Sequence, residues 1–199
     1  MTAMPQDLNA LIGSRICHDL ISPLGAIGNG VELLAMSGDA TGPEMGLIAQ
    51  SVENANARIR YFRVAFGAAK PGQSIGHTEV RSILSDLAQG SRVSYDWQPT
   101  TDAARPTVKL IFLLMQCFES AMPRGGLISV SHVGTQWAVT GEADKLLIKP
   151  DRWHMLSAPD AEMEIDAADV HFALAPLAAA RIGRRLTVES SETVARVRF

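Results

Sequence analysis

The strongest constraint on the fold is a pair of apolar repeats at helical spacing, separated by a short segment rich in helix breakers. Steps of three and four residues place the apolar side chains of each repeat on one face of a helix. We expect Thr41 or Gly42 to cap the second helix and Pro43 to be its first residue. The repeats predict an antiparallel helical hairpin. Their apolar residues are Ile16, Leu20, Leu24, Ile27, Val31 and Leu34, followed by Ile48, Val52, Ala55, Ile59, Phe62 and Phe66.

A hairpin of two helices cannot enclose its own apolar stripe, so this surface requires a partner. The spacing in the second repeat is that of a coiled-coil seam. The simplest arrangement that buries both stripes is a symmetric homodimer, in which two hairpins form a four-helix bundle.

A turn-rich stretch, Ala69-Lys70-Pro71-Gly72-Gln73-Ser74, ends the all-helical part of the chain. After it, helical and alternating patterns are interleaved. We therefore predict a helical hairpin over residues 1–70, a linker over 71–76 and a second domain over 77–199.

The second domain is predicted to pack helices on one mixed sheet, which makes the whole chain an α+β protein. A loop anchored by Trp153 is expected at 151–154. The expected helices span 78–89, 107–122 and 167–182, and the expected strands span 92–97, 127–133, 137–141, 145–149, 184–190 and 193–199.

Composition excludes several classes of protein. With 18 basic and 21 acidic residues, the net charge of −3 lacks the basic footprint of a nucleic-acid-binding protein. Cys17 and Cys117 form no CxxC motif and are expected to be buried thiols in a reducing cytoplasm. The N-terminus has no signal-peptide pattern, and the longest apolar run, 110–118, is about half of the roughly 20 residues that a membrane span needs. We expect a cytoplasmic protein without nucleic-acid or membrane partners.

His18 lies on the polar side of the first predicted helix. On a helical wheel, the residues almost opposite His18 are Ile16, Leu20, Ile27, Val31 and Leu34, whereas Ser22, Gly25 and Asn29 lie near it. A histidine of the core would lie with the apolar set, so we expect His18 to face solvent. A solvated surface residue is one interpretation, and an imidazole nucleophile is the other.

The run His18-Asp19-Leu20-Ile21-Ser22-Pro23-Leu24 resembles the H-box of dimerising histidine-kinase domains. The resemblance implies that His18 accepts a phosphoryl group and that Asp19 orients the imidazole, although Asp19 could also be a solvated helix residue. Pro23 removes a backbone donor inside the helix and is expected to kink it.

The region from the helix at 110–122 to the following strand resembles the N-box region of histidine-kinase ATPase domains. Gln116 and Ser120 stand where that family places asparagines that reach Mg²⁺ and nucleotide. The segment 157–164 has no glycine and is acidic, and Val170, Phe172 and Leu174 stand where glycines would be expected. We therefore expect a degenerate, Bergerat-like ATPase domain with no cofactor or metal bound by this chain.

A phosphoacceptor helix joined to a degenerate nucleotide domain resembles the ChpT family of histidine phosphotransferases. That resemblance implies a homodimer that takes a phosphoryl group from the receiver domain of a CckA-like hybrid kinase. It also implies CtrA-like and CpdR-like receivers as acceptors, with Mg²⁺ on the receiver. On the helix surface around His18, the residues expected to contact receivers are Arg15, Ile21, Ser22, Gly25 and Asn29.

Two other functions stay open at the level of sequence. A histidine kinase with a divergent ATP site would bind nucleotide, and a non-catalytic dimeric scaffold would keep its activity without His18. The remaining histidines show no metal-ligand spacing and are assigned to structure or solvent. A small basic patch near the last helix is either solvated or contacts an acidic receiver, and its residues are Arg181, Arg184 and Arg185.

Overall fold

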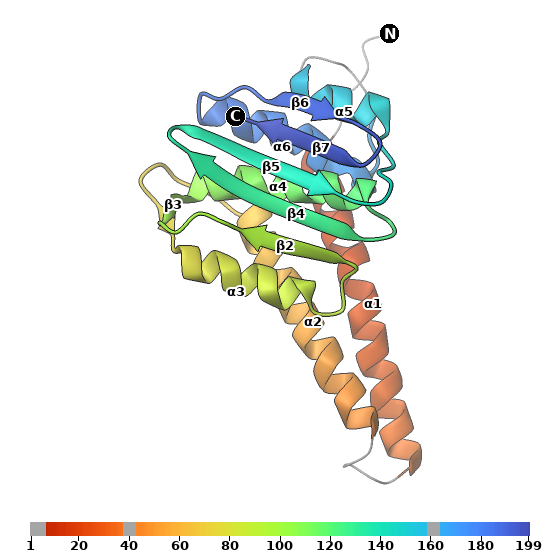
Figure 1. The fold of residues 1–199 in the computed structure, drawn as a ribbon. Coiled ribbons are helices and arrows are strands. Elements are labelled where there is room, and N and C mark those ends of the chain that lie inside the picture. The colour runs from red at the N-terminus through yellow and green to blue at the C-terminus, as the bar shows by residue number, and fades with distance from the viewer. Residues whose placement is uncertain (1–6, 38–42, 159–163) are drawn as a thin grey trace.

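The computed structural model describes residues 7–37, 43–158 and 164–199. Its N-terminal part is a hairpin of two long helices, α1 (Leu8–Ser37) and α2 (Pro43–Ala65), whose far end projects beyond the α/β part of the chain (Figure 1). The helical hairpin and the start of α2 at Pro43 are as predicted, whereas Thr41 and Gly42 lie outside the described residues. Pro23 lies inside α1 and does not end it.

The rest of the chain is an α/β unit, and the predicted α+β class is confirmed. Most predicted elements are present within a few residues of their expected bounds, and the helix expected at 167–182 is a short 3-10 turn, η1, followed by α6. The elements are β1 (Ser74–Ile75), α3 (His77–Ala88), β2 (Val93–Trp97), β3 (Ala103–Ala104), α4 (Arg105–Ala121), β4 (Gly126–Val133), β5 (Gln136–Glu142), α5 (Pro150–Ser157), η1 (Ala167–Asp169), α6 (Val170–Arg181), β6 (Thr187–Ser190) and β7 (Val194–Arg198).

The main sheet has five strands in the order β2-β4-β5-β7-β6. β2 runs parallel to β4, with Tyr95 opposite Ile128, and the crossover between them contains α4. The other neighbours are antiparallel. A parallel pair requires such a crossover, which places α4 against one face of the sheet (Figure 1).

α4 forms the centre of the core. The residues from Leu110 to Phe118 are all at most 2% exposed, because the sheet covers one side of the helix and α2 and α6 cover others. A helix that is apolar on most faces is stable only in such a central position.

The upper half of the hairpin, which contains the start of α1 and the end of α2, shares this core (Figure 1). The Tyr61 ring of α2 stacks on Phe112 of α4 at a centroid distance of 4.7 Å, and its hydroxyl donates to the Phe112 carbonyl over 2.7 Å. The predicted linker, 71–76, contains β1, which pairs with β3. The division at that linker stays a prediction, and this half of the hairpin is packed against the α/β unit.

Two local predictions were wrong. Residues 145–149 form no strand, because the Leu146 and Leu147 amides donate to the carbonyls of Glu192 and Ala121 rather than to a neighbouring strand. Residues 151–154 belong to helix α5 rather than to a loop. The anchoring role of Trp153 is confirmed, since its buried ring packs edge-on against Phe118 at a centroid distance of 5.1 Å.

The prediction of two buried thiols holds for Cys117 and is wrong for Cys17. Cys17 directly precedes His18 on α1 and shares its exposure, because the α/β unit does not extend over that part of the helix surface. Among the described residues, no helix combines the length and the apolar character needed to cross a membrane.

Candidate functional site

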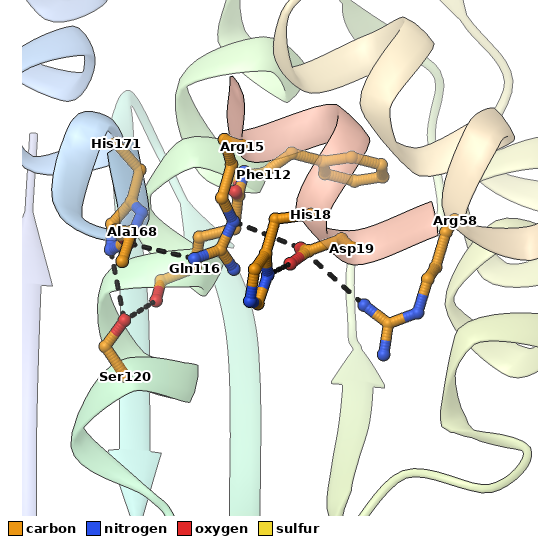
Figure 2. Close-up of polar contacts among 9 residues, drawn as sticks. All are labelled: Arg15, His18, Asp19, Arg58, Phe112, Gln116, Ser120, Ala168 and His171. Atoms are coloured by element: carbon orange, nitrogen blue, oxygen red, sulfur yellow. Dashed lines mark hydrogen bonds and ion pairs between the residues drawn. The ribbon is translucent and has the colours of Figure 1, made fainter. Parts of the chain in front are cut away.

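His18 projects from α1 into solvent, as predicted. Its side chain is 85% exposed, and its Nδ1 lies 3.1 Å from Asp19 Oδ1 (Figure 2). A carboxylate only accepts hydrogen bonds, so this contact places the imidazole proton on Nδ1 and leaves a lone pair on Nε2. In the neutral form of the ring, this arrangement presents a nucleophilic nitrogen at the surface of the helix.

Asp19 is held by two arginines. Its side chain is only 10% exposed, and its Oδ2 lies 3.1 Å from Arg15 Nε and 3.7 Å from Arg58 Nη1 (Figure 2). Arg15 precedes Asp19 by one helical turn, whereas Arg58 comes from α2. The carboxylate therefore uses one oxygen for His18 and the other for the two guanidinium groups, which fixes its orientation.

Arg15 also joins α1 to the α/β unit. Its Nη1 donates to the Ala168 carbonyl in η1 over 2.9 Å. The Arg15 side chain is 20% exposed, since these contacts occupy it inside the chain. Its predicted receiver contact stays untested, and the structure assigns it intramolecular partners. No local pattern could have revealed Ala168, which is 153 residues away.

The other predicted receiver contacts lie on the exposed surface of α1. Ile21 is 67% exposed, and Ser22, Gly25 and Asn29 are exposed as well. A Cβ at Gly25 would meet no atom within 4 Å, so the surface beside it is open. The structure thus brings these positions together with His18, and their contact with receivers stays a prediction.

A polar cleft of about 250 Å³ lies beside Asp19, between the hairpin and the α/β unit. Glu119 of α4 and Tyr95 of β2 line it, and the Tyr95 hydroxyl donates to Glu119 Oε1 over 2.8 Å. Burial raises the pKa of the Glu119 carboxyl to about 7, against a smaller opposing effect of the Tyr95 hydrogen bond. Sequence reasoning missed Glu119 and Arg58. A carboxylate on an otherwise apolar helix was the available signal for Glu119.

The two residues at the N-box positions form contacts inside the protein. Gln116 is buried, and Ser120 Oγ donates to the Gln116 carbonyl over 2.9 Å and lies 3.1 Å from His171 Nε2 (Figure 2). Burial lowers the pKa of the His171 imidazole to about 3, so this ring is neutral. The expectation that the chain binds no nucleotide or metal stays a prediction.

The start of α6 carries charges that are paired within the chain. The Asp169 side chain is 8% exposed and lies 3.0 Å from Arg152 Nε and 3.4 Å from Lys149 Nζ. Val170 and Phe172, at the positions where glycines would be expected, are buried in the core. This end of α6 is therefore closely packed, and the negative charge of Asp169 is balanced by Arg152 and Lys149.

The remaining histidines have structural surroundings, as expected. His77 Nδ1 lies 3.4 Å from Asp102 Oδ1, and the His132 ring stacks on Trp137 at a centroid distance of 4.2 Å. His171 is buried beside Ser120, and His154 is exposed on α5. None of these four contacts the network around His18 in the described part of the chain.

Known proteins resemble this chain over nearly its whole length. The family model for the histidine phosphotransferase C-terminal domain matches residues 77–194. Protein phosphotransferase ChpT of Brucella abortus (strain 2308) is 32% identical over 197 residues, which cover 96% of this chain and 94% of that protein. A solved structure described as a bacterial phosphotransferase is 30% identical with a TM-score of 0.78, and the match covers 100% of this chain and 98% of that one. The chain therefore belongs to the ChpT-like family of histidine phosphotransferases.

Proposed function

We propose that His18 carries the phosphoryl group and passes it between the aspartates of receiver domains. One observation carries this proposal: an imidazole that is 85% exposed is held at Nδ1 by a carboxylate that is 10% exposed. Exposure makes Nε2 accessible to a partner protein, and the hydrogen bond at Nδ1 keeps the ring in the nucleophilic tautomer.

In the first step, the Nε2 lone pair attacks the phosphorus of a receiver aspartyl phosphate. An N–P bond forms, the P–O bond to the aspartate breaks, and its electron pair stays on the aspartate carboxylate. The ring becomes positively charged, and Asp19, which accepts the Nδ1 proton in a hydrogen bond, stabilises that charge. In the second step, a carboxylate oxygen of another receiver attacks the phosphorus and forms a P–O bond. The N–P bond breaks, and its electron pair returns to Nε2, which restores the neutral imidazole.

We assign Arg15 and Arg58 as positioning residues for Asp19 rather than as catalytic residues. Their guanidinium groups lie on Asp19 Oδ2, away from the oxygen that accepts from His18. Mg²⁺, which we expect on the receiver, would neutralise phosphoryl oxygens during transfer. No step requires a metal held by this chain.

We further propose that the protein acts as a homodimer in which two hairpins form a four-helix bundle. Four residues of the predicted seam support this, because Leu24, Val31, Val52 and Ile59 are 58%, 52%, 40% and 44% exposed in the single chain. Apolar side chains aligned on one surface in this way are typical of an interface. The α/β unit covers one side of the upper half of the hairpin and leaves these four side chains exposed for a second copy.

We propose a hybrid-kinase receiver of the CckA-like kind as the donor, and CtrA-like and CpdR-like receivers as acceptors. Membership of the ChpT-like family supports this choice. We expect them to dock on the exposed α1 surface of Ile21, Ser22, Gly25 and Asn29, within reach of Nε2.

The test follows ³²P from a phosphorylated donor receiver to the protein, and separately from ATP. We expect the native protein to gain acid-labile label from the receiver only, and His18→Ala to gain none. His154→Ala is the matched control, since His154 is also exposed but lies on α5 away from the site.

Each other outcome identifies a different function. Label gained directly from ATP would identify a histidine kinase. With a donor proven to bind the protein, absence of label would favour a scaffold. Equal labelling of His18→Ala and native protein would place the phosphoacceptor on another residue.

A further inference from the structure

A cavity of about 720 Å³ opens where the upper end of the hairpin meets the α/β unit, and it shares no residue with the His18 site. Its volume lies within the range of about 300–1,000 Å³ that is usual for small-molecule sites. Four helices and the segment 68–72 contribute to its wall. The large apolar side chains in this wall are those of Ile12, Phe66, Leu113, Leu174, Leu177 and Ile182.

The lining combines apolar side chains with positively charged ones. Lys70, Lys109 and Arg181 are the charged residues that line the cavity, and no acidic side chain of the described residues does so. Positive charge gathered beside an apolar surface, without a counter-charge in the lining, attracts anions. A ligand that satisfies both features has an apolar part and an anionic group.

Lys109 is the best-placed donor for such a group. Its Nζ donates to the carbonyls of Gly67 over 2.8 Å and Phe66 over 3.4 Å. An ammonium group has three N–H bonds, so one is left for a ligand. Burial lowers the pKa of the Lys109 ammonium, and repulsion from Arg181 and Arg105 lowers it further. A bound anion would relieve this repulsion.

We propose that this cavity binds an amphipathic anion of the fatty-acid type. An alkyl chain would lie against Phe66, Leu113 and Leu174, and a carboxylate or phosphate would accept hydrogen bonds from Lys109 and Arg181. Such a ligand would contact α1, α2, α4 and α6 together, so it would stabilise the joint between the hairpin and the α/β unit. The proposal does not depend on the role of His18.

The test is isothermal titration calorimetry of the full chain with dodecanoate and dodecyl phosphate, both below their micelle concentrations. Dodecanol is the matched probe for the alkyl chain without the anionic group, and inorganic phosphate is the matched probe for the anion without an alkyl chain. We expect one saturable site per chain for the amphipathic anions and at least tenfold weaker binding of the other two probes. We also expect dodecanoate to raise the midpoint of thermal unfolding.

Substitutions in the lining test whether dodecanoate binds in this cavity. The double variant Lys109→Gln, Arg181→Gln should weaken dodecanoate binding about tenfold, because each lost charge-assisted hydrogen bond contributes to affinity. Leu177→Glu should weaken it similarly without altering Lys109, and Leu177 is 47% exposed, so this change is compatible with folding. Arg184→Gln is the matched control, since Arg184 is an exposed arginine outside the lining.

Three results would overturn the proposal. The first is no saturable binding of either amphipathic anion, as expected if a second copy of the chain covers the cavity. The second is binding that both the double variant and Leu177→Glu leave unchanged. The third is binding of inorganic phosphate or dodecanol as tight as that of dodecanoate.

Discussion

The two halves of the helical hairpin differ in what covers their apolar residues. In the upper half, Phe62 of the predicted seam is buried in the core of the α/β unit, together with its neighbours Tyr61 and Val64. In the lower half, Val31 and Val52 of the same predicted seam are half exposed. The first half is positioned by its own chain and carries His18, whereas the second leaves an apolar surface exposed. One apolar pattern is thus buried in part within the chain and left exposed in part, and the exposed part is the surface that the proposed dimer would use.

Removing a ring that packs against the upper half should have the largest effect on stability. Phe112→Ala deletes a fully buried ring that stacks on Tyr61, and it should lower the free energy of unfolding by about 3–5 kcal/mol. Urea unfolding monitored by circular dichroism measures this. Leu33→Ala, at a half-exposed position of the lower half, should cost less than about 1 kcal/mol in a monomeric sample. Equal losses of unfolding free energy in the two variants would contradict this difference between the halves.

A charge in the lower half should break assembly and leave the protomer folded. Val52→Glu would place an uncompensated carboxylate in each half of the proposed interface, and we expect it to weaken dimerisation by about 3 kcal/mol, roughly a hundredfold. Light scattering after size exclusion should give the mass of two chains for the native protein and of one for the variant. Glu53→Gln, next to it and exposed, should stay dimeric. A monomeric native protein would disprove the bundle.

The contacts of Arg15 should make it more important for transfer than Arg58. Arg15 has two internal partners and is 20% exposed, whereas Arg58 lies 3.7 Å from Asp19 and is 45% exposed. We expect Arg15→Gln to lower the transfer rate about tenfold and Arg58→Gln less than threefold. A fall in the maximal rate at constant receiver affinity indicates positioning of Asp19. A loss of receiver affinity alone would instead favour the predicted receiver contact.

The raised pKa of Glu119 predicts that the free energy of unfolding falls as the pH rises. Its carboxyl has a pKa of about 7 in the folded protein and an ordinary pKa of 4.5, so between these pH values the carboxyl is ionised in the unfolded chain and protonated in the folded one. Stability from this group is therefore full below about pH 4.5 and falls as the pH rises toward 7. Relative to Glu119→Gln, which cannot ionise, the native protein should lose at least about 1 kcal/mol between pH 4.5 and 7.5.

Urea unfolding of the native protein and Glu119→Gln at several pH values measures this difference. Glu32→Gln is the control, because Glu32 is exposed on the lower half of α1. A constant difference between native protein and Glu119→Gln across that range would contradict the assignment.

Much of the fold could be predicted because local patterns dictate it. The three-and-four spacing predicted α1 and α2, and the same periodicity placed His18 opposite the seam, where it is 85% exposed. Alternation predicted β2, β4 and β5. The prediction failed at 145–149, where the apolar Leu146 and Leu147 do not pair with a strand. Their backbone partners, Glu192 and Ala121, are distant in sequence.

The sequence by itself determined the helical hairpin, the exposure of His18 and the carboxylate next to it, because helical geometry relates residues only a few positions apart. Tertiary structure alone decided what surrounds that pair. It brought Arg58, Glu119 and the Ala168 carbonyl to the site from three other elements, and it left Cys17 exposed. It also buried part of the predicted seam and left part of it exposed. These features depend on contacts between distant segments, which form only when the chain buries α4 as a common core.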